Sequence, residues 1–303
     1  MVDSGTQQRP VARQTGDAQA SPATEDVSVP VRYDRRRLTY SNTFDSSIKR
    51  LAIRAIEWLT GKISVIRMLR QYQRGEAPTR LNFWHRTMEI MRIDIRTPAE
   101  QIARIPAEGP VIIVANHPHG LVDGMVLADL VSRVRLDFKV LSRAILTGID
   151  ETAASFMISV PFQHEADAQR KGIEMRAAAM QQLDEGGVVI LFPSGVVAAS
   201  ETMFGPAIEA EWNVFTAKMI RRSGATVLPV YFPGQNSRWY QVANKISATL
   251  RQGLLLHEIV AACGKPQFPV IGQPIDPKEI EARGGDPRAF MAWLRDQTLA
   301  LKE

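Results

Sequence analysis

Two histidines and an aspartate lie close together near the middle of the chain. His117 and His119 follow a run of mostly β-branched residues at 111–115, and Asp123 comes shortly after them. A neutral imidazole is the usual general base near neutral pH, because the reference pKa of histidine is about 6.5. A carboxylate bound to the second ring nitrogen fixes the tautomer and stabilises the imidazolium that forms. No serine or cysteine adjoins these residues, so they predict a base that activates a hydroxyl group of the substrate itself.

The residues around this motif predict how it is held. The apolar run at 111–115 predicts a short buried strand. Pro118 cannot continue a strand ladder and Gly120 allows unusual backbone dihedral angles, so the strand ends sharply. A helical pattern then runs from Asp123 through Leu130. Because ligands bind at the carboxyl ends of strands in α/β sheets, we expect an active site at this edge of a sheet.

Three other interpretations of the motif are open. A His-x-His pair followed by an acid is similar to the metallo-hydrolase pattern, but Leu121 and Val122 stand where that pattern continues, so we predict no metal. A serine hydrolase with Ser194 as its nucleophile would need a Gly-x-Ser-x-Gly elbow, whereas the chain has FPSGV at 192–196. The last interpretation is a structural histidine whose hydrogen bonds are satisfied at a strand end.

The composition is that of an ordinary globular protein. The 303 residues are 45% hydrophobic, which suits one large domain or at most two. Lysine and arginine outnumber aspartate and glutamate by 37 to 32, a modest excess that fits anionic lipid, nucleic acid or an acidic carrier protein. Cys263 is the only cysteine, so no intramolecular disulfide is possible and a reducing compartment is expected. The sequence has neither an apolar run of about 18 residues nor a secretory h-region, so we predict no transmembrane helix and no signal peptide.

The chain before residue 93 falls into two parts. Residues 1–40 are mostly small and polar and predict a disordered tail. Residues 41–92 predict a basic amphipathic helical region, with apolar residues at steps of three or four over 46–74 and a break at Gly61. A second amphipathic run covers 80–91. Such a region suits an interfacial membrane helix, and it equally suits helices packed on the main sheet with solvated arginines, so both interpretations stay open.

Residues 93–303 alternate between patterns typical of strands and patterns typical of helices. Strands are expected at 93–96, 111–115, 138–141, 157–162, 188–192, 226–232 and 268–271, and helices at 123–134, 167–183, 209–223, 239–256 and 286–301. This alternation predicts one α/β domain with a mixed, largely parallel sheet flanked by helices.

Several blocks of the sequence, in order, resemble those of the glycerolipid acyltransferases, the family of lysophosphatidate and glycerol-3-phosphate acyltransferases. NHPHGLVD at 116–123 resembles their first block, and the strand expected before Ser142 lies where their second block does. FPSG at 192–195 resembles their Phe-Pro-Glu-Gly block, and VLPV at 227–230 resembles their Val-Pro-Val block. VIGQPI at 270–275 resembles the end of the family's sequences. The details are most similar to the bacterial hemolysin-like and lyso-ornithine-lipid acyltransferase branch, which also has His-Pro-x-Gly-x-x-Asp and, here at 234–237, Gly-x-Asn-Ser.

The resemblance implies a glycerol-3-phosphate acyltransferase-like fold and the transfer of a fatty acyl group from an acyl thioester to a hydroxyl group of a lysolipid-type acceptor. It assigns the catalytic base to His117 with Asp123 as its partner, and it leaves His119, at a variable position, as the alternative base. The substrate-binding residues that it implies are Arg143, Phe192, Pro193, Ser194, Gly195 and Asn236. Backbone amides near Gly195 are the expected oxyanion donors. Ser194 replaces the glutamate of the family, which puts glycerol 3-phosphate in doubt as the acceptor.

The resemblance also implies partners and a location. The co-substrate would be acyl-CoA or acyl carrier protein, and no cofactor is expected. The expected partners are the membrane surface, a lysolipid and the carrier, with no nucleic acid. We expect a peripheral protein on the cytoplasmic side of the membrane. Two other functions stay open, namely a lipid-binding protein of the same fold that has lost catalysis, as Ser194 suggests, and a lipase or thioesterase.

Overall fold

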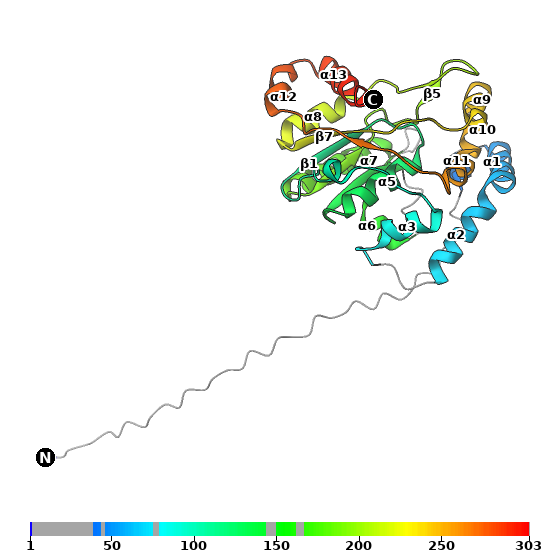
Figure 1. Ribbon diagram of the computed structural model, residues 1–303, viewed down its shortest axis with the longest axis horizontal. Helices are drawn as coiled ribbons and strands as arrows, with labels where there is room; N and C mark the ends of the chain where they lie inside the picture. The colour runs from blue at the N-terminus through cyan, green and yellow to red at the C-terminus, as the bar shows by residue number, and fades with distance from the viewer. Residues whose placement is uncertain (2–38, 44–45, 75–78, 144–149, 162–166, 303) are drawn as a thin grey trace. The chain divides into compact units, whose positions relative to one another are not determined.

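A six-stranded sheet lies at the centre of the computed structural model, which describes residues 1, 39–43, 46–74, 79–143, 150–161 and 167–302 (Figure 1). The strand order is β3 (Met157–Val160), β2 (Phe138–Arg143), β4 (Val188–Leu191), β1 (Val111–Ala115), β7 (Thr226–Tyr231) and β8 (Val270–Ile271). Neighbouring strands are parallel except for β7 and β8, which pair antiparallel. The predicted α/β class with a mixed, largely parallel sheet is therefore confirmed.

Helices cover both faces of the sheet. One face packs on α3 (Phe83–Met91), α5 (Leu121–Ser132) and α11 (Leu255–Ala262), and the other packs on α7 (Ala168–Asp184), α8 (Val214–Ser223) and α13 (Pro287–Leu299) (Figure 1). Ile113 of β1 lies in the first of these two cores and Ile112 lies in the second. Successive side chains of a strand point to opposite faces, so β1 is buried on both sides. This double burial explains why its sequence is apolar without alternation.

The middle of the sheet brings three loops together. β1 lies between β4 and β7, with Val114 in register with Leu191 and Pro229. Because these three strands are parallel, the segments that follow them meet at the same edge of the sheet. These segments contain the histidine motif, the FPSG stretch and the Gly-x-Asn-Ser stretch.

The N-terminal helices pack beside this domain. The predicted break at Gly61 separates α1 (Ser47–Thr60) from α2 (Lys62–Arg74). A side chain at Gly61 would place its Cβ 2.7 Å from the carbonyl oxygen of Leu256, so glycine allows this joint to lie directly on α11. A short 3-10 helix, η1 (Tyr40–Thr43), packs on α1. Of the predicted disordered tail at 1–40, residues 2–38 lie outside the described residues.

One predicted strand does not form, and one predicted helix begins later than expected. Residues 93–96 do not form a strand, since within this segment only Ile95 makes an isolated bridge, which joins it to Gln267. The helix expected at 209–223 begins at Val214, because the side chain of Asn213 accepts a hydrogen bond from Phe215 N at 2.8 Å and caps the helix there.

The helix expected at 239–256 is divided into three. These are α9 (Arg238–Ile246), α10 (Ala248–Gly253) and α11. Ser247 has extended dihedral angles, and its hydroxyl caps α10 by accepting from Thr249 N at 3.2 Å. A serine of this kind ends one helix and starts the next.

Short elements were not expected from the sequence. They are α4 (Ala99–Ile102), α6 (Glu151–Ser155), α12 (Pro277–Arg283) and the antiparallel pair β5 (Ala199–Ser200) and β6 (Ala207–Ile208). Elements this short carry too few residues for a periodic pattern. None of the helices in the described part of the chain is both long and apolar enough to cross a membrane.

Candidate active site

One buried carboxylate binds both candidate histidines. Asp123 Oδ2 lies 3.1 Å from Nδ1 of His117, and Asp123 Oδ1 lies 3.0 Å from Nδ1 of His119. The backbone N–H of His119 also donates to Asp123 Oδ2, at 2.8 Å. The side chain of Asp123 is 0% exposed, whereas those of His117 and His119 are 17% and 15% exposed. The structure thus brings the three predicted residues into one cluster in which each ring turns Nδ1 toward the carboxylate.

The histidines determine the charge of this carboxylate. Burial by itself raises the pKa of Asp123, but the charge of His119 and the hydrogen bonds from both rings outweigh burial and hold this pKa below its usual value. Asp123 is therefore ionised at neutral pH. An ionised carboxylate at Nδ1 is what a histidine needs if Nε2 is to take up a proton.

Two further residues fix the backbone of the motif. The side chain of Asn116 donates to Phe232 O at 2.8 Å and accepts from Phe232 N at 2.7 Å, which fastens the end of β1 to the end of β7. Glu209 is buried and accepts a hydrogen bond from His117 N at 3.0 Å. Its second oxygen accepts from the indole N–H of Trp212 at 2.9 Å. The start of the motif is thus held by residues from distant parts of the chain.

The loop after β4 lies against His117. The ring of Phe192 stacks on the His117 ring, with centroids 4.0 Å apart and planes 25° apart. Pro193 is buried, and the hydroxyl of Ser194 donates within its own loop to Val196 O at 3.0 Å. The N–H of Gly195 donates to Phe192 O at 2.9 Å, so this amide is engaged in the turn, and the expected oxyanion donors among the backbone amides near Gly195 stay a prediction.

Arg143 joins this loop from the end of β2. Its Nη2 lies 3.4 Å from Gly195 O. Burial of the guanidinium, followed by the charge of Arg251 from α10, lowers the pKa of Arg143. A second cation therefore lies close enough to act on Arg143, which suits a site that receives an anionic group.

The loop after β7 lies against His119. Gly234 has a φ of +95°, and a Cβ there would lie 3.0 Å from His119 Nε2, so glycine is required both for the backbone conformation and for the close approach. Asn236 is buried, and its Nδ2 has no hydrogen-bond partner among the described residues. Ser237 donates from its N and its hydroxyl to the carboxylate of Glu258 on α11, at 2.8 and 2.5 Å.

The predicted residues therefore fall into two groups. Phe192 packs on His117 in the loop that Arg143 reaches, and Asn236 belongs to the loop on the His119 side. Sequence reasoning did not single out Glu209 or Glu258. Neither stands in a recognisable motif, and only the fold brings them to the histidines. Among the described residues, no group of three or more His, Cys, Asp and Glu side chains could hold a metal ion.

Comparison with known proteins identifies the family. A sequence model described as "Acyltransferase" matches residues 42–303. The chain belongs to this acyltransferase family. The match begins just before α1 and runs to the end of the chain, so it includes the N-terminal helices as well as the sheet and the histidine cluster. The family resemblance predicted from the sequence is confirmed.

Individual known proteins resemble this acyltransferase-family chain at modest sequence identity. A lyso-glycine lipid O-acyltransferase of Bacteroides thetaiotaomicron is 29% identical over 172 residues, which are 55% of this chain and 59% of the relative. The chain thus matches little more than half of that protein. The crystal structure of the 1-acyl-sn-glycerophosphate acyltransferase PlsC from Thermotoga maritima superposes with a TM-score of 0.48 at 14% identity, covering 84% of this chain and 95% of the other.

Proposed function

We propose that the protein transfers a fatty acyl group from an acyl thioester to a hydroxyl group of a lysolipid-type acceptor, with His117 as the general base. The observation that carries the proposal is the ionised, buried Asp123 at 3.1 Å from His117 Nδ1, in a chain of the acyltransferase family. Phe192 supports the choice of His117 rather than His119 as the base. The ring of Phe192 stacks on the His117 ring and so restricts the motion of the imidazole.

The proposed reaction is a proton transfer followed by acyl transfer. Nε2 of His117 takes the proton of the acceptor hydroxyl while Nδ1–H remains bound to Asp123 Oδ2. The acceptor oxygen forms a bond to the thioester carbonyl carbon, and the carbon–sulfur bond breaks. The thiolate then takes the proton from His117. The products are an ester and a free thiol, and the histidine returns to its neutral form.

The acceptor is proposed to be a lysolipid rather than glycerol 3-phosphate. Ser194 offers a neutral hydroxyl where the resembling enzymes have a carboxylate, and this hydroxyl already donates to Val196 O. The name of the Bacteroides relative, a lyso-glycine lipid O-acyltransferase, supports a lysolipid acceptor. We assign Arg143, on which the charge of Arg251 also acts, to an anionic group of the acceptor or of the donor.

Measurement of free thiol tests this function. Purified protein is incubated with acyl-CoA or with acyl carrier protein, with and without a lysolipid dispersed in detergent. We expect thiol release that depends on the lysolipid, together with the acylated lipid by mass spectrometry. Equal thiol release without the acceptor would indicate a thioesterase, and binding of the lipid without thiol release from either donor would indicate an inactive lipid-binding protein.

We propose that α1 and α2 bind the membrane surface. Ile48, Leu51 and Leu59 recur along one side of α1 and are 82%, 71% and 86% exposed. A helix that packs only on its own protein turns such a stripe inward, whereas an interfacial helix turns it toward lipid. These three residues are called the outer stripe of α1. By contrast Val65 of α2 and the aromatic residues of α3 pack in the main core.

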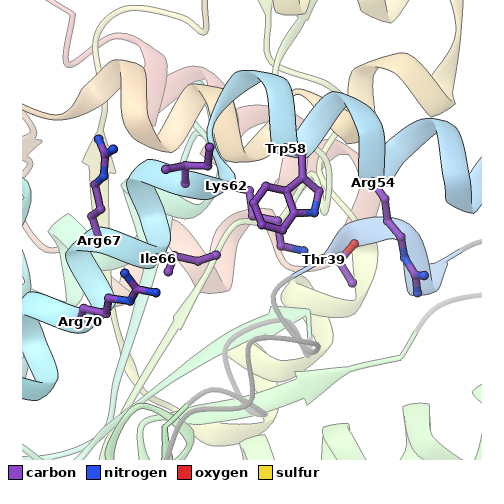
Figure 2. Close-up of a pocket in the computed structure, with 8 residues that line it drawn as sticks. Thr39, Arg54, Trp58, Lys62, Ile66, Arg67 and Arg70 are labelled. Atoms are coloured by element: carbon purple, nitrogen blue, oxygen red, sulfur yellow. The ribbon is translucent and has the colours of Figure 1, made fainter.

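A cationic groove adjoins the outer stripe. Its volume is about 830 Å³, and it is lined by Thr39, Arg54, Trp58, Lys62, Ile63, Ile66, Arg67 and Arg70. Figure 2 shows Arg54 and Trp58 extending from α1, with Arg67 and Arg70 extending from α2. None of these lining residues is acidic. Basic side chains beside exposed apolar ones match the headgroup and acyl regions of an anionic lipid surface.

Charge removal in the cationic groove should weaken membrane binding. Each cation near an anionic surface contributes about 1 kcal/mol, so Arg67→Gln with Arg70→Gln is expected to lower partitioning onto anionic phospholipid vesicles about 30-fold. Vesicle sedimentation measures this, and vesicles of neutral lipid should show little change. The matched control is Arg222→Gln with Arg288→Gln, which removes two exposed arginines from α8 and α13. Equal losses in the two double variants would contradict the proposed site.

A further inference from the structure

His119 makes two hydrogen bonds to Asp123, one from its ring and one from its backbone. Its ring occupies one carboxylate oxygen and its backbone N–H binds the other, at 3.0 and 2.8 Å. His117 binds only Oδ2, through its ring. The orientation of the carboxylate toward His117 is therefore set largely by His119.

The environments of the two rings differ. The His117 ring packs on Phe192, in the loop that Arg143 reaches. The His119 ring packs on Gly234, and the buried Glu258 lies behind that loop, held by Ser237. His117 thus lies against the loop at 192–195, whereas His119 lies against the loop that contains Asn236 and has a second carboxylate, Glu258, near it.

The charged groups that act on His119 come from several elements. They are Asp123 of α5, Glu258 of α11 and Lys265, which follows α11. His117 faces His119 across the Asp123 carboxylate that both rings bind. Burial by itself lowers the pKa of His119, but the two carboxylates outweigh burial and Lys265, so the pKa of His119 is raised. The protonated form of this ring is favoured over that of an ordinary histidine.

We propose that His119 is a positioning residue whose ring and backbone N–H hold the Asp123 carboxylate toward His117, and whose ring competes with that of His117 for the charge of this carboxylate. The inference rests on the proposed function, in which His117 is the base. Two rings that share one carboxylate compete for its charge, and a cation on one ring disfavours a second cation on the other.

The pH profile of kcat/KM tests this role. His119→Asn places an amide donor near the position of Nδ1 and removes the charge. Without that charge the Asp123 carboxylate acts on His117 alone, so we expect the acid limb of the profile to move to higher pH, by about one unit. His119→Phe also removes the donor, and we expect the same shift with a plateau about tenfold lower than that of His119→Asn. The control is His85→Asn, on the exposed side of α3.

Three outcomes distinguish the alternatives. A lower plateau with an unmoved acid limb in His119→Asn would overturn the proposal and leave His119 a structural role. An inactive His119→Asn beside an active His117→Ala would instead overturn the proposed function, because His119 would be the base. If the variants fail to fold, NMR titration of the imidazoles in the wild-type protein decides, and a His119 ring that titrates at or below the usual histidine value would overturn the proposal.

Discussion

Replacing His117 by alanine should lower the rate of acyl transfer by roughly 10²- to 10⁴-fold, the range that a general base contributes. The variant loses Nε2, the only atom in the proposed reaction that removes the acceptor proton. Asp123 cannot take over, because it is 0% exposed and bound to His119 on both oxygens. The measurement is the initial rate of lysolipid-dependent thiol release at saturating donor and acceptor.

Two comparisons make this result specific. His85→Ala removes an exposed histidine from α3 and should keep the wild-type rate. Thermal unfolding should show that His117→Ala still folds, since Asp123 keeps both contacts with His119. A wild-type rate in His117→Ala would refute His117 as the base.

The local parts of this site could be predicted from the sequence. The apolar run at 111–115 is unbroken because β1 is covered on both faces. Pro118 and Gly120 mark where the strand ends, and the pairing of a histidine with Asp123 follows from residue types and spacing alone. The spacing did not choose between His117 and His119, and the structure shows why, since one carboxylate binds both rings.

The parts that depend on distant contacts could not be predicted. Glu209 was assigned to the start of a helix, yet it lies before α8 and its carboxylate holds the backbone of His117. Glu258 lies on α11 and approaches His119 only because β7 delivers the loop at 234–237 to the same edge. A single buried acid carries no periodic or motif signal, so its role appears only when the fold is known.

The partner that each N-terminal helix faces could not be predicted from the sequence either. The sequence left interfacial helices and packed helices equally open. In the structure α3 packs in the main core through Trp84, while Leu51 and Leu59 of α1 are exposed. Periodicity identifies an apolar stripe but not the partner that the stripe faces, and that partner is decided by how the chain arranges the helices.

Asp123→Asn should lower the rate of acyl transfer about as far as His117→Ala, by roughly 10³- to 10⁴-fold. An amide at this position can still accept a hydrogen bond from one ring, but it brings no negative charge to stabilise the imidazolium of His117. The backbone N–H of His119 donates to Oδ2 and therefore keeps the amide oxygen at that position. The amide N–H₂ then faces Nδ1 of His119, so that ring must give up its proton at Nδ1. The same thiol-release assay measures the loss.

The double variant separates a shared role from two independent ones. If Asp123 acts only through His117, then His117→Ala with Asp123→Asn should be no slower than His117→Ala alone, within a few-fold, because residues that act as a unit are not additive. Losses that multiply would mean that Asp123 contributes to catalysis without His117. Asp123 would then act through His119, whose ring binds the same carboxylate at 3.0 Å. In that case, adding His119→Asn to the double variant should remove the residual activity.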